Sequence, residues 1–257
     1  MAVPPATLPP PKPTFTSGAG GPYDDDELAS NHGHGTDNTL RITRILEEHD
    51  IPCCLVGISA LIFYGATRVR PYFRTEICVL TELVDKAAEL LQSGAYASDY
   101  SLSKGIDHYF ILVPSRDAHI NCEPSNVTRS LRGLPYPKLE VFIQSCLDTR
   151  NELQLCDVVD GSNVSEQWGE NNLQLDGCNY VEWADDMNRR GKEYANGKFA
   201  HGAPFVPDVP KSRREMWQSK VRTKEDRLDW TKPKDIFVTQ YRIVDDPDPW
   251  MVLSDMY

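Results

Sequence analysis

The sequence predicts a mixed α+β domain, and three observations lead to that prediction. Short apolar runs rich in β-branched and aromatic residues alternate with amphipathic helical segments in the first half of the chain. The second half keeps mainly helical spacing. The chain has 257 residues, 40% of them hydrophobic and 25% charged, which is enough to enclose an ordinary globular core with polar extensions.

The elements of the first half follow from apolar spacing and from chain breakers. Helical intervals predict helices, short apolar runs predict buried strands, and glycine or proline marks where each ends. The expected elements are a helix from about 36 that ends before Pro52, a strand over 53–56, a turn at 57–59, a helical turn over 60–64, a strand over 75–80, a helix over 81–93, and strands over 109–113 and 118–122. We therefore expect a sheet of at least four strands.

The second part of the domain is expected to be helical, with helices over 138–149 and 153–159. Residues before this domain are rich in proline, glycine and aspartate, a composition that buries too little apolar surface to fold. After Gly191 the apolar periodicity is lost. We divide the chain into a disordered tail over 1–35, a domain over 36–190 and an irregular C-terminal extension over 191–257.

Charge and composition exclude several classes of protein. The net charge of −11 disfavours general binding to DNA or RNA, because such a surface repels phosphate polymers. No run of eighteen apolar residues is present, and the first residues do not resemble a secretory signal. The seven cysteines contain no Cys-x-x-Cys pair, so buried reduced thiols are expected. We expect a cytoplasmic protein that does not enter a membrane.

One segment departs from the acidic average. Residues 211–234 carry nine basic and four acidic side chains. An amphipathic surface helix that folds back on acidic partners is the favoured interpretation, ahead of a stripe that binds phosphate.

The run from Ile51 to Arg68, Ile-Pro-Cys-Cys-Leu-Val-Gly-Ile-Ser-Ala-Leu-Ile-Phe-Tyr-Gly-Ala-Thr-Arg, resembles the opening of a nucleotidyltransferase-fold domain. The resemblance extends over about 38–160, and 139–160 is similar to the helical half of antitoxin-like and kanamycin-type branches. It implies a mixed sheet in which the turn at Gly57 and Ser59 holds a triphosphate through backbone amides, with Arg68 nearby. It also implies an Asp-x-Asp pair on the following strand.

That pair is degenerate here, since Glu76 and Cys78 stand at its two positions. Nucleotidyl transfer needs two carboxylates on alternate residues of one strand to hold Mg²⁺, and a thiol is a poor ligand for that ion. Glu123 or Asp117 could supply a third carboxylate, but Mg²⁺ is disfavoured and no other cofactor is indicated. Alternatively, Glu76 is paired with a nearby arginine, and Cys78 is a core thiol.

Polar residues alternate along the last expected strand of the sheet. His119, Asn121 and Glu123 would lie on one face, where they could perform acid–base chemistry if that face lines a cleft. A solvated polar face of the sheet is the alternative.

Three functions remain open. The first is a pseudoenzyme that holds a nucleotide or the 3′ end of a tRNA, with Glu76, Glu123 and His119 as candidate catalytic residues if it is an active transferase. The second is aminoacyl transfer, which needs no metal, as in the fungal arginine-containing cyclodipeptide synthases; the Asp-Asp-x-x-Glu motif associated with that family is absent here. The third is a non-catalytic interaction module that uses the proline-rich N-terminus and the C-terminal tryptophans.

Overall fold

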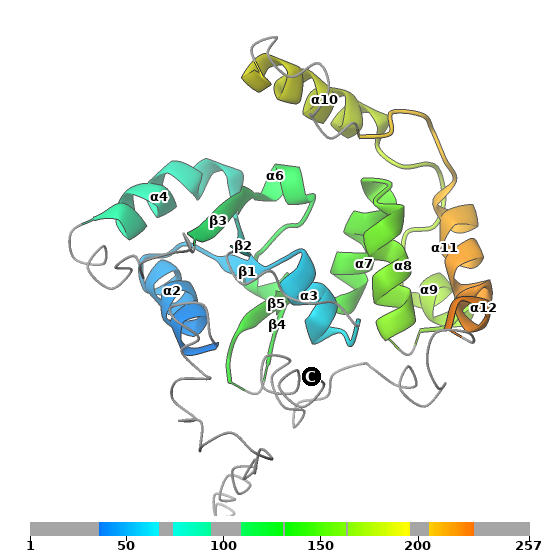
Figure 1. Cartoon of the computed structure of the whole chain (residues 1–257), viewed down its shortest axis with the longest axis horizontal. Coiled ribbons are helices and arrows are strands. Elements are labelled where there is room, and N and C mark those ends of the chain that lie inside the picture. The colour runs from blue at the N-terminus through cyan, green and yellow to red at the C-terminus, as the bar shows by residue number, and fades with distance from the viewer. Residues whose placement is uncertain are drawn as a thin grey trace, which may run out of the picture.

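The computed structural model describes residues 36–66, 74–93, 109–130, 132–162, 164–195 and 206–228. The described chain is a mixed α+β structure with two small sheets and flanking helices, which confirms the predicted fold class (Figure 1). The expected tail over 1–35 and Arg68 lie outside the described residues. No helix of the described ranges has the length and apolar character needed to cross a membrane.

The main sheet has three strands in the order β1-β2-β3, namely β1 (Cys53–Leu55), β2 (Arg74–Val79) and β3 (Tyr109–Pro114). Strand β1 runs antiparallel to β2, with Cys54 opposite Cys78. Strand β3 runs parallel to β2, with Ile111 beside Glu76. A separate antiparallel ribbon joins β4 (Val127–Arg129) to β5 (Pro135–Pro137).

The prediction of a fourth strand over 118–122 is wrong. The chain instead forms the one-turn helix α6 (Ser115–Ala118), and His119 then takes the left-handed conformation, with φ of 50°. Ile120 and Cys122 are buried from the loop that follows. The alternating apolar pattern therefore reflected alternate burial of side chains without the backbone pairing of a strand. The described part of the main sheet has three strands rather than four or more.

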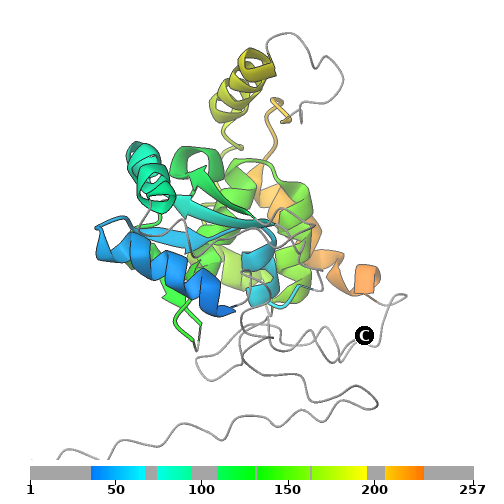
Figure 2. The same cartoon turned by 60° about the vertical axis from the view of Figure 1, so that its left-hand side comes forward.

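Helices flank the sheet and fill the second half of the chain (Figures 1 and 2). The first half contains α2 (Thr36–Glu48), α3 (Ile58–Phe63), η2 (Thr81–Leu83), α4 (Val84–Gln92) and, after α6, η4 (Pro124–Asn126). The second half contains α7 (Leu139–Asp148), α8 (Glu152–Gly161), α9 (Glu166–Asn172), α10 (Val181–Ala195), α11 (Arg213–Arg222) and α12 (Lys224–Leu228). We call the described residues up to 137 the sheet half and those from 138 on the helical half.

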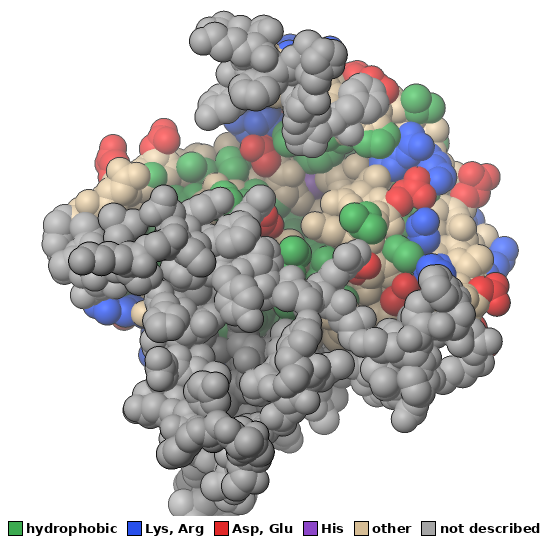
Figure 3. All heavy atoms as spheres, in the orientation of Figure 1, with side chains coloured by type: hydrophobic (Ala, Val, Ile, Leu, Met, Phe, Trp, Pro, Cys, Tyr) green, Lys and Arg blue, Asp and Glu red, His purple; other side chains and the backbone are tan. Residues whose placement is uncertain are grey.

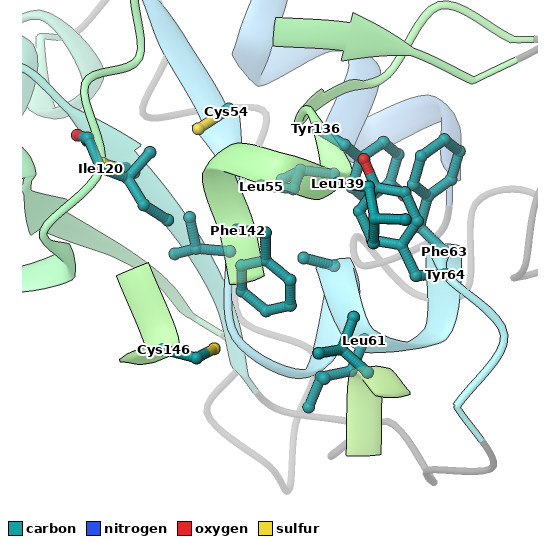
Figure 4. Close-up of a cluster of buried hydrophobic side chains, with 14 of the residues drawn as sticks. Cys54, Leu55, Leu61, Phe63, Tyr64, Ile120, Tyr136, Leu139, Phe142 and Cys146 are labelled. Carbon is teal, nitrogen blue, oxygen red and sulfur yellow. Dashed lines mark hydrogen bonds between the residues drawn. The ribbon is translucent and has the colours of Figure 1, made fainter. Parts of the chain in front are cut away.

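One apolar core joins the two halves. Figure 4 shows where they meet, with Phe142 of α7 among side chains of β1, α3 and the 119–123 loop. The rings of Phe63 and Tyr136 stack with their centroids 4.0 Å apart. Tyr64 is buried and donates its hydroxyl to the carbonyl of Pro137 over 2.5 Å. Sheet, ribbon and helices thus share a single packed interior, as close packing of a small domain requires.

The segment after 206 differs from the irregular extension that we expected. Helix α11 packs on α7, α8 and α9, and its Trp217 is fully buried. Over the described residues 211–228, the basic side chains fold back on acidic partners as expected, but α11 does not have the apolar stripe of the amphipathic helix that was predicted. Ion pairs join Arg213 to Asp148, Lys211 and Lys220 to Glu152, Arg214 to Glu170, Arg222 to Glu166, and Arg227 to Asp160. Figure 3 shows basic and acidic side chains interleaved on the side of the molecule where α11 and α12 lie.

The cysteines are free thiols, and five of the seven are buried, as expected. Cys54 and Cys78 lie side by side on β1 and β2, and Cys122 lies against Cys78. The hydrogen bond from Cys122 favours ionisation of Cys78, but the bond to Cys54 and burial outweigh it and raise the pKa of Cys78 above its ordinary value. Cys78 is therefore a protonated core thiol.

Candidate functional site

The structure brings Gly57 and Glu76 together at the start of α3. Gly57 has a φ of 61°, a conformation that glycine adopts readily, and its neighbour Val56 donates its N–H to the carbonyl of Glu76 over 3.1 Å. A Cβ on Gly57 would lie 2.0 Å from Oε2 of Glu76. The carboxylate is thus packed against the turn that the sequence suggested as a phosphate cradle. Ser59 is buried in the first turn of α3.

The surroundings of Glu76 do not fit a Mg²⁺ site of the nucleotidyltransferase kind. Its alternate neighbour Cys78 is buried among thiols, and Ile111 and Val113 stand beside these two positions on β3. No group of three or more His, Cys, Asp or Glu side chains in the described ranges could hold a metal ion. Hard cations need several oxygen ligands, which this part of the sheet does not supply.

A cleft of about 730 Å³ opens elsewhere, where β2 and β3 end. Its walls come from the segments that follow these strands, from the 119–123 loop and from one face of α7, with the chain after α9 closing one side. Its polar lining includes His119, Asn121, Glu123, Gln144 and Asp148. Parallel strands that end at one edge commonly place functional groups together in this way.

His119 and Asp148, which both line this cleft, face each other. His119 Nε2 lies 3.2 Å from Asp148 Oδ2, and the imidazole is about one-third exposed while the carboxylate is 8% exposed. Arg213 Nε lies 2.7 Å from Asp148 Oδ1, and the Gln144 amide donates to the same oxygen over 2.9 Å. The carboxylate is therefore held on both oxygens, and it in turn fixes the imidazole.

Other contacts hold the loop that carries His119. Ser145 of α7 donates its hydroxyl to the carbonyl of Ala118 over 2.7 Å, which ties the residue before His119 to the helix that carries Asp148. The ring of Tyr180 lies 5.0 Å from the imidazole, centroid to centroid. Trp183, at the start of α10, donates its indole N–H to the carbonyl of Arg116 over 2.6 Å. The geometry of the pair is thus fixed by several elements at once.

The sequence-predicted residues fall into two groups. His119, Asn121 and Glu123 line the cleft, although they reach it from a loop and not from a strand. Gly57, Ser59 and Glu76 are not among the residues that line it. Asp117, the other candidate third carboxylate, is bound to Arg190 over 2.7 Å.

Asp148 and Arg213 were missed by sequence reasoning. Asp148 lies 29 residues from His119, and no spacing motif links the two. One weak signal was present: Asp148 occupies the last position of α7, where the helix dipole disfavours an acid, so a specific cationic partner is expected there.

No family model, no curated protein and no solved structure matches this chain. Function is therefore inferred from the geometry of the cleft.

Proposed function

We propose that this protein is a metal-independent acyl-transfer enzyme in which His119 acts as the general base. The observation that carries the proposal is the His119–Asp148 pair, which is fixed by Arg213 and Gln144 and opens into a cleft large enough for a small organic ligand. A histidine oriented by a buried carboxylate is a recurring arrangement for proton transfer.

The two ring nitrogens of His119 have different roles. Because Nε2 of His119 faces Asp148, Nδ1 is the nitrogen that a bound ligand can reach, and none of the described residues hydrogen-bonds it. Asp148 stabilises the positive charge that forms when the imidazole takes up a proton. Arg116 and Asn121, which also line the cleft, carry N–H donors that could face the oxygen of a carbonyl group.

The proposed reaction joins an amine to an acyl ester. The amine nitrogen forms a bond to the ester carbonyl carbon and gives its proton to Nδ1 of His119. The ester C–O bond then breaks, and the leaving oxygen takes that proton back. An aminoacyl ester, as at the 3′ end of a charged tRNA, is the substrate class that we propose, because its transfer to an amine needs no metal ion.

The test is incubation of the full chain with charged tRNA and mass analysis of the products. We expect loss of the aminoacyl ester and release of a peptide-bonded product, and a drop of roughly 10²- to 10⁴-fold in rate for His119→Asn. His49→Asn, which changes a histidine just after the end of α2, is the matched control and should leave the rate unchanged. Absence of ester consumption, or equal rates for wild type and His119→Asn, would overturn the proposal.

A second candidate function is nucleotide binding at the turn of Gly57. The positive φ of Gly57 at the start of α3 favours it, whereas the nearby carboxylate of Glu76 would repel a phosphate. Glu76→Gln would remove this charge, so ATP should raise the melting temperature of the variant more than that of the wild type. No shift in either protein up to millimolar ATP would exclude this function.

A further inference from the structure

The exposed large apolar side chains of the described residues belong to one region of the surface. They are Leu153, Tyr180 and Val209, which are 67%, 44% and 62% exposed. Hydrogen bonds join the segments that carry them: Arg150 donates from Nη1 to the carbonyl of Val209 over 2.9 Å, and Tyr180 donates its backbone N–H to the carbonyl of Asp148 over 2.8 Å. Leu153 follows these two acceptor and donor residues at the start of α8. We call Leu153, Tyr180 and Val209 the apolar patch, and such a grouping indicates an interaction surface.

Basic side chains lie beside the apolar patch. Arg150, Lys211 and Lys220 all approach the carboxylate of Glu152, at 3.6, 2.7 and 3.3 Å. One carboxylate neutralises only one of these three cations. Asp208 adds a second acid here, so the cations still outnumber the acids by three to two. In a chain of net charge −11, this surface thus favours a partner that is both acidic and apolar.

The C-terminal part of the sequence combines these two features. Residues 245–253 read Asp-Asp-Pro-Asp-Pro-Trp-Met-Val-Leu, in which three acids are followed by four apolar residues. The acidic run over 24–27 is instead followed by Leu-Ala-Ser-Asn, which offers less apolar surface. Of these two acidic segments, 245–253 is therefore the one that complements both the charge and the apolar character of the patch.

The length of the intervening chain permits contact between 245–253 and the patch. Helix α12 ends at Leu228 and packs on α8, the ten-residue helix that carries Leu153 near its start. A ten-residue helix is about 15 Å long, whereas the sixteen residues 229–244 can span up to about 50 Å. The segment can thus reach the patch from the end of α12.

We infer that residues 245–253, which lie outside the described residues, bind the apolar patch of their own chain. Their aspartates face Lys211 and Lys220, and the apolar residues that follow cover the patch. Because the ring of Tyr180 lies 5.0 Å from that of His119, the bound segment borders the cleft. The inference goes beyond the proposed function and does not depend on it.

A zero-length carbodiimide cross-link tests this contact in the full chain. The reagent joins a lysine Nζ to a carboxyl carbon as an amide and leaves as a urea, so it reports only groups in contact. The link between Lys211 and Glu152, whose charged atoms lie 2.7 Å apart, is the internal reference. We expect peptide mass analysis to find Lys211 or Lys220 also joined to an aspartate of 245–248. Absence of this link while the reference forms, or links from these lysines to 24–27 instead, would overturn the inference.

Isotope mixing distinguishes contact within one chain from contact between two copies. Chains labelled with nitrogen-15 are mixed with unlabelled chains before the cross-linking. We expect cross-linked peptides in which both parts carry the same isotope. Peptides of mixed isotope in proportion to the mixing would assign the contact to a second copy and overturn the inference.

A double variant of the segment tests its apolar part. Trp250→Ser/Leu253→Ser keeps every carboxylate, so the chemistry of the cross-link is unchanged. We expect the yield of the link to 245–248 to fall roughly threefold or more, because apolar burial is lost. Phe15→Ser/Leu28→Ser is the matched control near the acidic run of the N-terminal part, and it should leave the yield unchanged.

A second double variant tests the patch itself. Leu153→Ser/Val209→Ser changes two exposed positions, so it should fold as the wild type does and still form the link between Lys211 and Glu152. We expect it to lose the link to 245–248 to the same extent as the variant of the segment. A yield equal to that of the wild type in both double variants would overturn the inference.

Discussion

Different interactions stabilise the two halves of this molecule. Aliphatic, aromatic and sulfur-containing side chains pack the sheet half, where Cys54, Cys78 and Cys122 lie in contact. The helical half adds to its apolar core a series of ion pairs between α11 or α12 and the acids of α7, α8 and α9. The cleft between them is lined by both polar and apolar side chains, and ion pairs do not hold its glutamates among the described residues. The difference shows that ion pairs add to apolar packing mainly where α11 and α12 meet the rest of the helical half.

The largest effect that we expect is the protection of the buried thiols of the sheet half from a thiol reagent. With a thiol reagent at neutral pH, exposed Cys178 should react first, and Cys53, Cys54 and Cys78 should react roughly a thousandfold more slowly or less, because they are reached only through near-global unfolding. Burial also raises the pKa of Cys53 well above its ordinary value, which lowers its thiolate fraction. Cys178→Ser should abolish the fast phase; buried thiols that react as fast as Cys178 would contradict this packing.

The next effect concerns the buried ion pair of the helical half. Arg213→Met should lower the free energy of unfolding by about 3–5 kcal/mol, because it leaves the carboxylate of Asp148 buried without its cation. Arg222, on the same helix as Arg213, is an exposed partner of Glu166. Arg222→Met should therefore change the free energy of unfolding little. The double variant Arg213→Met/Asp148→Leu should recover much of the loss. Urea unfolding measures all three, and equal costs for Arg213→Met and Arg222→Met would refute the distinction.

A smaller effect is expected at the turn of Gly57. Gly57→Ala should cost about 1–3 kcal/mol, because a Cβ collides with the carboxylate of Glu76 and because φ is positive. Adding Glu76→Ala removes the collision but not the backbone strain, so the double variant should recover part of the loss. Thermal unfolding of the wild type, Gly57→Ala, Glu76→Ala and the double variant measures the coupling free energy between the two residues. Strictly additive costs would show that the two residues do not meet.

The smallest effect is the pH dependence of one ion pair in the helical half. Burial acts to raise the pKa of Glu152, but hydrogen bonds from Lys211 and Lys220 outweigh it and hold the pKa below its ordinary value. The pair therefore stabilises the fold above the unfolded pKa of about 4.3, and this contribution is lost as the pH falls through the folded pKa. Glu152→Gln should be less stable than wild type at pH 7, by up to about 1 kcal/mol, and the difference should shrink below about pH 4. A difference that grows on acidification would contradict the assignment.

Much of the fold was predictable, and the errors have identifiable causes. The strands at 53, 75 and 109 and the helices at 36, 84, 139 and 152 produce strong local patterns, and each was predicted within a few residues. Helix α11 has no apolar stripe of ordinary width, because Arg213, Met216 and Trp217 alone bury against the core and charges supply the rest. Periodicity could not reveal this helix, and only the excess of basic residues indicated its role.

The candidate site was predicted in part. His119 and Glu123 were chosen because their types suit acid–base chemistry, and both line the cleft. Asp148 and Arg213 could not be found in the same way, since they belong to different helices and lie far apart in the sequence. The turn of Gly57 was also recognised, but its contact with the carboxylate of Glu76 depends on how β2 lies beside α3.

By itself the sequence determined the fold class, the strands of the main sheet, the helices α2, α3, α4, α7 and α8, and the burial of most cysteines, because propensity and periodicity act over a few neighbouring residues. Tertiary structure alone decided which charges meet: His119 with Asp148, Asp148 with Arg213, and Glu76 with the Gly57 turn. These contacts join residues far apart in the chain, and their geometry is set by the packing of whole elements, which no local pattern encodes.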